Sequence, residues 1–434
     1  MNATIATLLA AACASLASGA GPDLIVGDLF GPTRWGNDGN IHAYSFGVAT
    51  CNVGNEPAAW HASSSNHPII TMNLYRLHEG RFEQIGMSWA HHGFFALQQA
   101  LCQTCTPGTP GAQLGAGCSE VSSASIMGQQ QGLGARSRIN PFTGVFEFPQ
   151  QEMGSVGNII FKRLQVHEAD LTTPGASYYA SAQIVSKDES PTGTNSLSWR
   201  PVTVAPNFGL TFSGQTRRMQ PAIFAWAEAH PQVTLNHVDL PDDGRFWVGA
   251  LVTDNNDGTW TYEYAVENVN AHRAAKGFFV PMGDGVVSVI GFHDVEYHSG
   301  EPYSTTDWAS DINEGHVRWN AVVDSIDEAN TNALRWGTLY NFRFISTSPP
   351  TAGNVRIEPF LDGVLDVVDV VSLIPSTAPC LADFNGDGDV NFFDVQEFLA
   401  AFSANDPAAD FNGDELINFF DVQIFLGLFS DGCP

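Results

Sequence analysis

The sequence predicts a mainly β protein that ends in a small helical domain. Between residues 21 and 374, short apolar runs are separated by clusters of glycine, proline, serine and asparagine, a spacing typical of strands joined by turns. After residue 244 several runs alternate apolar and polar residues, the period of two expected for a half-buried strand. After residue 390, apolar residues recur instead at helical spacing in two short segments. With 434 residues and 44% apolar content, the chain is long enough for two or three separate cores.

The N-terminal segment, residues 1–20, has the composition of an export signal. It is a run of small and apolar residues that ends in Ser18-Gly19-Ala20, the kind of sequence that a signal peptidase recognises. After residue 20 the sequence contains no run of 18 apolar residues, so we expect no transmembrane segment. We therefore expect a secreted protein, located outside the cell or at the cell surface.

The charge balance is strongly acidic. Asp and Glu number 46 against 18 Lys and Arg, which gives a formal net charge of -28. Such a field repels nucleic acid and anionic lipid, and it attracts divalent cations. The composition argues against a nucleic-acid partner and favours a cation as ligand.

Residues 21–240 are expected to form a β-rich domain that contains disulfides. Six cysteines follow the leader, an even number that predicts three disulfide bonds in an exported chain. Four of them lie in this domain and allow three connectivities, which the sequence leaves open: Cys51, Cys102, Cys105 and Cys118. A zinc site built from these cysteines is the alternative. An alanine-rich segment, residues 219–230, predicts one helix.

Residues 241–374 are expected to form an immunoglobulin-like or fibronectin-like β-sandwich, because about seven strands can be placed within them. The clearest two strands flank residues 254–258, where an Asp-Gly step predicts a hairpin. In the second of these strands, Glu263 and Glu267 share the face opposite the aromatic residues, and we expect them to face solvent. Residues 375–379 predict a short, stiff hinge.

The C-terminal residues 380–434 contain one loop sequence twice, beginning at Asp383 and again 27 residues later at Asp410. In both loops, oxygen-bearing groups recur at positions 1, 3, 5, 7, 9 and 12, the spacing with which a single loop binds Ca²⁺. The expected ligands in loop one are Asp383, Asn385, Asp387, Asp389, Asn391 and Asp394. Those in loop two are Asp410, Asn412, Asp414, Leu416 through its carbonyl, Asn418 and Asp421.

The two loops differ at position 6, where the chain must turn sharply. Loop one has Gly388 there, whereas loop two has Glu415. A residue with a Cβ atom costs roughly 1 kcal/mol in the left-handed conformation. Loop two also has Leu416 where loop one has Asp389, so it has one carboxylate fewer nearby. We therefore expect loop two to bind calcium more weakly.

One predicted helix follows each loop, and neither loop has room for a helix before it. The expected apolar stripes are Phe392, Val395, Leu399 and Phe402, then Phe419, Val422, Leu426 and Phe429. This duplicated loop-helix arrangement resembles a dockerin, over residues 380–434 only. The resemblance implies a calcium-dependent fold and docking onto a cohesin-like or other surface receptor, often in polysaccharide breakdown. Cys380 and Cys433 bracket the repeats without other local candidates, and we expect them to form a disulfide.

The loops depart from the dockerin pattern at positions 10 and 11. Cohesin-binding dockerins commonly carry polar pairs there, whereas this chain has Phe392-Phe393 and Phe419-Phe420. Two explanations remain open. The four phenylalanines form an apolar docking surface for a different receptor, or at least one of each pair fills the core of this small domain.

The body of the chain, residues 21–374, contains no catalytic motif. A glycosidase needs two carboxylates across a cleft. The obvious pair is Glu263 and Glu267, which we expect to be solvated charges, and the other conceivable candidates, without supporting spacing, are Glu228, Asp294 and Glu296. Histidines that could contribute to a metal site are His61, His67, His91, His92 and His237. We favour a body that binds or has a structural role. The alternative is a tethered hydrolase that acts on O-glycosyl bonds in polysaccharides.

Overall fold

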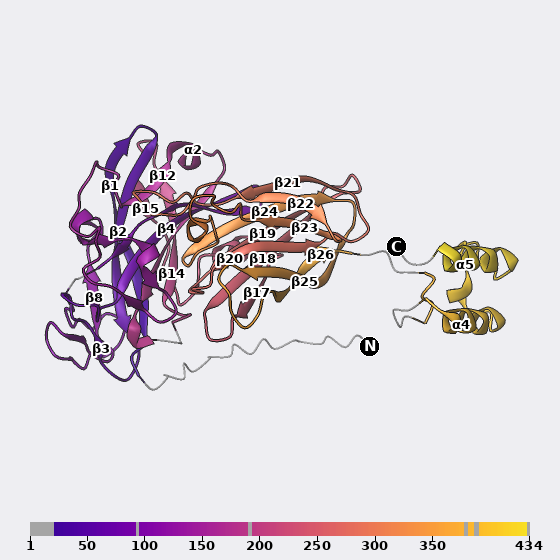
Figure 1. The fold of residues 1–434 in the computed structure, drawn as a ribbon, viewed down its shortest axis with the longest axis horizontal. Coiled ribbons are helices and arrows are strands. Elements are labelled where there is room, and N and C mark those ends of the chain that lie inside the picture. Colours follow the sequence, from indigo (N-terminus) through magenta and orange to yellow (C-terminus); the bar gives the residue numbers. More distant parts are fainter. Residues whose placement is uncertain (1–20, 93–94, 190–192, 377–380, 386–389, 432–434) are drawn as a thin grey trace, which may run out of the picture.

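The computed structural model describes residues 21–92, 95–189, 193–376, 381–385 and 390–431. The expected export signal, the pair Cys380 and Cys433, and the loop-one residues Asp387, Gly388 and Asp389 lie outside these ranges. As the sequence predicts, the protein is mainly β, with a small helical region at the C-terminus (Figure 1). Within the described ranges, no helix is long and apolar enough to cross a membrane.

The first part of the chain folds around one large antiparallel sheet. Its main path is, in order, β1 (Leu24–Asp38), β2 (Ile41–Asn52), β12 (Leu164–His167), β5 (Arg81–Met87), β4 (Ile69–His78), β13 (Ser177–Val185), β14 (Leu197–Val204) and β15 (Leu210–Phe212). Short strands join beside this path: β6 (Ala90–His91), β8 (Ser119–Ser122), β9 (Leu133–Gly134) and β16 (Arg217–Arg218).

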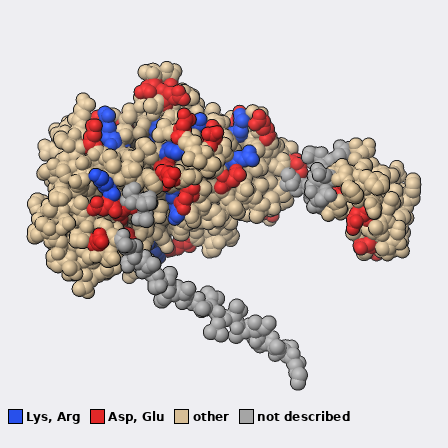
Figure 2. All heavy atoms as spheres, turned by 60° about the horizontal axis from the view of Figure 1, so that its bottom comes forward, with Lys and Arg blue, Asp and Glu red and all other residues tan. Residues whose placement is uncertain are grey.

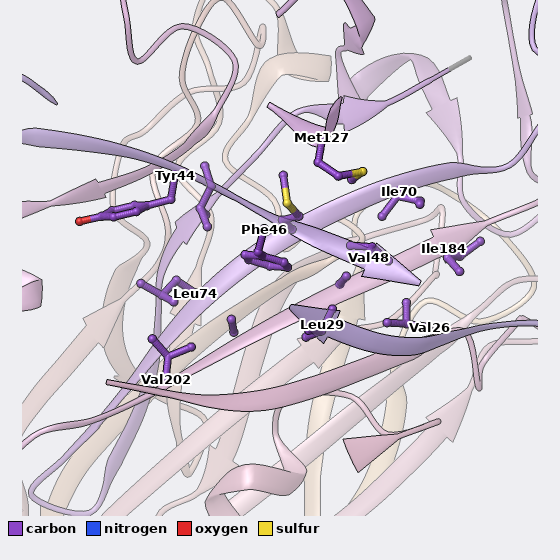
Figure 3. Close-up of a cluster of buried hydrophobic side chains, with 14 of the residues drawn as sticks. Val26, Leu29, Tyr44, Phe46, Val48, Ile70, Leu74, Met127, Ile184 and Val202 are labelled. Atoms are coloured by element: carbon purple, nitrogen blue, oxygen red, sulfur yellow. The ribbon is translucent and has the colours of Figure 1, made fainter. Parts of the chain in front are cut away.

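The two ends of this sheet curl toward each other. The Ser198 hydroxyl on β14 donates to the Val26 carbonyl on β1 at 2.6 Å, and Arg218 Nε on β16 donates to the Gly27 carbonyl at 2.6 Å. Apolar side chains from both halves of the sheet fill the space enclosed by this curl (Figure 3). The labelled members include Val26, Phe46, Leu74, Ile184 and Val202, which come from β1, β2, β4, β13 and β14.

Two disulfides hold the irregular segment that follows β6. Cys51 on β2 pairs with Cys102, and Cys105 pairs with Cys118. This resolves the connectivity that the sequence left open, and it excludes the zinc site because the four sulfur atoms are bonded in pairs. The segment carries short elements: β7 (Gln113–Leu114), which pairs with β3 (Ala58–Ala59), α1 (Ala124–Met127), and the pair β10 (Ile139–Asn140) and β11 (Val145–Phe146).

The second part of the chain is a sandwich of two five-stranded antiparallel sheets. One contains, in order, β17 (Thr234–Asp239), β18 (Arg245–Asp254), β19 (Trp260–Asn268), β24 (Thr338–Ser346) and β21 (Val287–His293). The other contains β22 (Ala309–Asn313), β23 (His316–Asn320), β20 (Ala275–Pro281), β25 (Pro350–Pro359) and β26 (Val368–Pro375). The predicted hairpin is confirmed, since β18 and β19 pair across residues 255–259.

The sandwich has ten described strands where the sequence predicts about seven. The three that were missed are β17, β22 and β23. The first two contain Asn and Asp among few apolar residues and lack a clear alternation, whereas β23 alternates but is only five residues long. Upstream, the predicted helix at residues 219–230 is reduced to α3 (Phe224–Ala229), because Met219 has a φ of +60° and follows directly after β16. The other short helix of the body is α2 (Glu168–Leu171).

The first sheet packs against the outer face of the sandwich sheet that contains β19. Trp226, Phe82 and Tyr75 from the first part meet Leu251 and Ala265 from the sandwich in one buried cluster. The expectation that Glu263 and Glu267 face solvent is therefore wrong, since they are only 4% and 2% exposed. The sequence pattern identified the strand and its two faces, but it did not show that a second sheet covers the outer face.

The C-terminal helical unit, residues 381–385 and 390–431, contains α4 (Phe392–Ser403) and α5 (Phe419–Asp431) (Figure 1). Its core is centred on Phe398, Ala409 and Phe425, with partly buried residues around them: Phe384, Val395, Ala401, Phe402, Phe411, Ile417, Val422 and Phe429. The predicted stripe is thus wrong in part. Leu399 and Leu426 are 47% and 49% exposed, and Phe398 and Phe425 replace them in the core.

The candidate docking and calcium-binding unit

Loop two, residues 410–421, is described in full and has the backbone that the calcium spacing requires. Glu415 at position 6 has a φ of +65°, and Gly413 two residues before it has a φ of +71°. The Asp410 carboxylate accepts hydrogen bonds from the backbone N–H groups of Gly413 and Glu415, at 2.8 and 2.9 Å. These bonds close the loop around its first residue, so the side chains at positions 1, 3 and 5 lie on one short turn.

The aspartate at position 12 anchors each loop to its helix. Asp421 Oδ1 accepts from the Asn412 N–H at 3.2 Å, and its Oδ2 accepts from the Asn418 N–H at 2.7 Å. Asp394 repeats this arrangement with the N–H groups of Asn385 and Asn391, at 3.2 and 2.8 Å. Both aspartates are 0% exposed. In each loop the backbone N–H at position 9 is the main cause that lowers the pKa of the aspartate, so both are carboxylates at neutral pH.

Loop one is described only at its two ends, which match loop two. Asp383 and Asn385 are described before the gap, and Asn391 and Asp394 after it. The Asn391 side chain accepts from the Phe393 N–H at 2.8 Å and caps α4, as Asn418 does for the Phe420 N–H at 2.9 Å. The two repeats therefore enter their helices in the same way.

The donors of loop two fit a calcium ion. Hard oxygen ligands are what Ca²⁺ prefers, and this loop offers carboxylate, amide and carbonyl oxygens at the required positions. Within the described ranges, no group of three His, Cys, Asp or Glu side chains is arranged to hold a metal ion, but half of the six expected loop-two donors are asparagines and a carbonyl. Residues 381–434 contain eleven Asp and Glu and no Lys or Arg, and the unit shows acidic side chains without basic ones in Figure 2. This charge favours cation binding further.

The four phenylalanines at loop positions 10 and 11 all point outward. Phe392, Phe393, Phe419 and Phe420 are 72%, 64%, 71% and 63% exposed. None of them belongs to the core of the unit, which is built from other phenylalanines. Further exposed apolar side chains of the unit are Leu381, Leu399, Leu416, Ile424 and Leu426. An apolar surface of this density on so small a unit is typical of an interaction site.

Among the carboxylates considered for catalysis in the body, Asp294 and Glu296 line one cavity, whereas Glu228 lies elsewhere. Glu228 on α3 forms an ion pair with Arg217, which lowers its pKa. Asp294 and Glu296 line a cavity of about 310 Å³ between β21 and the first sheet. Burial raises the pKa of Asp294 to about 6, and a 2.5 Å hydrogen bond from Asn332 opposes this effect. The lining also includes His167, Asp170, His293, His298 and Asp307, but no tryptophan.

The histidines considered for a metal site are mostly interior, and so are many of the tryptophans. His67, His91 and His92 are 2–3% exposed and come together, whereas His61 is exposed and the His237 ring packs at a tilt against Trp247. Several tryptophans are fully buried, so they belong to the core and not to a sugar-binding surface: Trp60, Trp89, Trp199, Trp226 and Trp319. The sequence analysis names His67, His91 and His92 as possible metal ligands, but their spacing could not show that they meet, because β4 and β5 lie between them.

Neither a protein-family model nor a curated protein matches this chain. Among solved structures, it has a weak likeness to a serine-rich repeat adhesion glycoprotein (Srr1) from Streptococcus agalactiae, with a TM-score of 0.20, 9% identity, and 81% of this chain and 98% of that chain covered. The exo-chitosanase CsxA from Amycolatopsis orientalis follows, with a TM-score of 0.15, 10% identity, and 76% of this chain but only 25% of that one covered. Likenesses this low carry no argument about fold or function.

Proposed function

We propose that this is a secreted modular protein whose dockerin-like C-terminal unit anchors it, in a calcium-dependent way, to a protein on a scaffold or cell surface. The single observation that carries the proposal is the exposure of both phenylalanine pairs. The unit leaves four phenylalanines in water while other phenylalanines fill its core. Covering these four side chains with a partner would therefore be favourable, because it removes apolar surface from water.

Calcium enters this proposal as the organiser of the docking surface. The ion would be held by the loop oxygens of Asp410, Asn412, Asp414, Asn418 and Asp421, and by the matching residues of loop one. Each phenylalanine pair directly precedes the position-12 aspartate of its loop. An ordered loop therefore fixes where the two aromatic rings stand. Bound calcium supplies the charge that holds the acidic loop together.

The partner is expected to present an apolar surface. Phenylalanine at positions 10 and 11 cannot replace the hydrogen bonds that a polar pair makes, so a cohesin of the usual kind is a poor match. A cohesin-like receptor with an apolar contact surface, or another surface protein, fits better. The body is then the cargo, and its binding or structural role is exerted at the place of attachment.

A second candidate function, hydrolysis of polysaccharide, is favoured by one observation only. Asp294 has a pKa raised to about 6 and lies in a cavity beside the carboxylate Glu296, and a carboxyl group of this kind can act as a general acid. Incubation of the full chain with a panel of polysaccharides tests this candidate. Release of reducing sugar that the Asp294→Asn variant abolishes would support it.

The tethering proposal is tested by capture from extracts of the source cells. The full chain and a chain that ends at residue 376 are immobilised and compared in calcium and in chelator. We expect one or more surface proteins to bind the full chain in calcium only. Equal capture by the shortened chain, or capture that survives the chelator, would contradict the proposal.

A further inference from the structure

A cluster of buried polar side chains lies where the loop before β4, the end of β6 and the segment after β11 meet. His67, His92 and Gln150 are 3%, 2% and 4% exposed. They come from three separate segments of the chain and are not used by the proposed docking function. Buried polar atoms normally have hydrogen-bond partners, so the contacts of this cluster need an account.

The two imidazole rings are held in fixed orientations. His67 Nε2 and His92 Nδ1 are 3.1 Å apart, which is a hydrogen bond, and the ring planes meet at 83°. Phe146 and Phe148 pack on both rings, with centroid distances of 4.9 to 6.1 Å. Burial lowers the pKa of both histidines, so both rings are neutral at pH 7.

The outer nitrogen of His92, Nε2, lacks a hydrogen-bond partner among the described residues. The His67 ring interacts instead with the backbone of His61 and Ser64, which opposes the effect of burial on its pKa. Each neutral imidazole carries one N–H, and one of the two rings uses its N–H for the bond between them. When His92 donates from Nδ1, its Nε2 is left with a free lone pair. This is the tautomer in which a metal-binding histidine gives its other N–H to a neighbour that orients it.

The Gln150 amide lies at the same place. Neither its nitrogen nor its oxygen has a partner among the described residues. Gln150 Oε1 and His92 Nε2 both lie within 3 Å of the point where a side chain on Gly134 would begin. The missing side chain of Gly134 thus leaves room between an amide oxygen and an imidazole nitrogen. The ring of His91 lies 3.2 Å from the corresponding point on Gly132, two residues before Gly134.

We propose that His92 Nε2 and Gln150 Oε1 bind one divalent transition-metal ion, with His67 as the residue that orients His92. Imidazole nitrogen beside an amide oxygen suits Zn²⁺, Co²⁺, Ni²⁺ or Cu²⁺ better than Ca²⁺. Gln150 and Phe146 also line a cavity of about 460 Å³, which supplies a route to the site and space for the water that completes the coordination. The site is separate from the loops that are proposed to bind calcium.

The test uses the full chain, stripped of metals and then saturated with calcium so that the oxygen-rich loops are occupied. Titration with Co²⁺, followed by its visible absorption and by calorimetry, is expected to show one ion per chain. The His92→Gln variant is expected to bind at least tenfold more weakly. His61→Gln is the matched control, because His61 is an exposed histidine of the same region, and it is expected to bind as the natural protein does.

Two further variants separate metal binding from packing. Gln150→Glu adds a carboxylate ligand, so it is expected to tighten Co²⁺ binding at least tenfold; without a metal, it would only bury a charge and lower the melting temperature. His67→Phe is expected to weaken binding about tenfold and shift the Co²⁺ absorption band. His67→Gln, whose amide oxygen can accept the same N–H, is expected to restore the band. Two results would overturn the proposal: the absence of stoichiometric Co²⁺ binding, or binding that is lost in His61→Gln but kept in His92→Gln. The polar atoms of the cluster would then be assigned to a buried water molecule.

Discussion

Phe398 on α4 stacks on Phe425 on α5, with ring centroids 4.0 Å apart and planes within 11° of parallel. The two residues occupy the same position in the two repeats, 27 residues apart. The repeats therefore pack through their matching residue, and the helix faces that carry Phe392 and Phe419 turn away from this contact. The core and the exposed surface of the unit are both built from phenylalanines, but from different ones. Each set can therefore be substituted without changing the other.

Substitution of the stacked pair is expected to unfold the unit, whereas substitution of the outer phenylalanines is not. Phe398→Ala should destabilise the unit by about 3–5 kcal/mol, because it opens a cavity in the core. Phe392→Ala should change its stability by less than about 0.5 kcal/mol, since the side chain is 72% exposed. Calorimetry of both variants in calcium measures the two effects. Similar losses in both would show that the outer ring is part of the core.

Position 6 of loop two offers a gain in calcium affinity. Glu415 holds a φ of +65°, where glycine has no steric penalty. Glu415→Gly is therefore expected to tighten calcium binding at loop two by about 1 kcal/mol, roughly fivefold. Glu415→Gln is the control, because it removes the same charge but keeps the Cβ atom. Calorimetric titration with calcium measures the affinity of both variants. An equal gain in both would mean that the loss of the charge, and not of the Cβ atom, raises the affinity.

The titration of Glu267 is expected to make the stability of the body depend on pH, and substitution of this residue should remove that dependence. Burial raises its pKa to about 7, opposed by hydrogen bonds from the Ile223 and Ala222 N–H groups. In the unfolded chain the pKa is near 4.3, so the unfolded state releases its proton first as pH rises. Stability from this group is fully present below about pH 4 and is lost by about pH 7, a change on the order of 3 kcal/mol.

The Glu267→Gln variant keeps an oxygen for the two N–H groups but has no proton to release. Relative to the natural protein, it is expected to be more stable at pH 8 and nearly equal at pH 5. Melting temperatures measured across this range test the prediction. A difference that stays constant with pH would mean that Glu267 does not titrate there.

The ion pair between Arg81 and Glu263 connects the first sheet to the sandwich. Arg81 donates to both carboxylate oxygens of Glu263, at 3.1 to 3.3 Å. Glu263 is 4% exposed, so removal of its partner leaves a buried charge. Arg81→Ala should therefore destabilise the body by about 2–3 kcal/mol, and the double variant Arg81→Met with Glu263→Met should lose less. Thermal unfolding of both compares them, and a greater loss in the double variant would refute this explanation.

The sequence predicted the structural elements that are determined by residues close together in the chain. The hairpin at residues 254–258 follows from its Asp-Gly step, and the helix after each C-terminal loop follows from the apolar spacing of its residues. Contacts between distant segments could not be predicted. The pairing of Cys51 with Cys102 depends on how the segment after β6 folds back, and the burial of Glu267 depends on the first sheet.

The same limit applies to the candidate sites. Loop spacing predicts the calcium ligands, because all the expected ones lie within twelve residues. It could not decide whether Phe392 and Phe393 are core or surface, because a period of 3.6 allows the apolar face of α4 to be centred on either Phe398 or Leu399. His92 and Gln150 share no sequence pattern, and only the fold brings them together at Gly134.

The most direct test of the central claim is binding of the full chain to the surface of source cells, compared with a variant that carries serine at positions 392, 393, 419 and 420. Calcium binding of the variant is measured first and is expected to be unchanged, since these side chains are exposed and lie outside the core. We predict saturable, calcium-dependent binding of the natural chain and at least a tenfold loss in the variant. Equal binding of the two chains in calcium would contradict the assignment of the phenylalanine pairs as the docking surface.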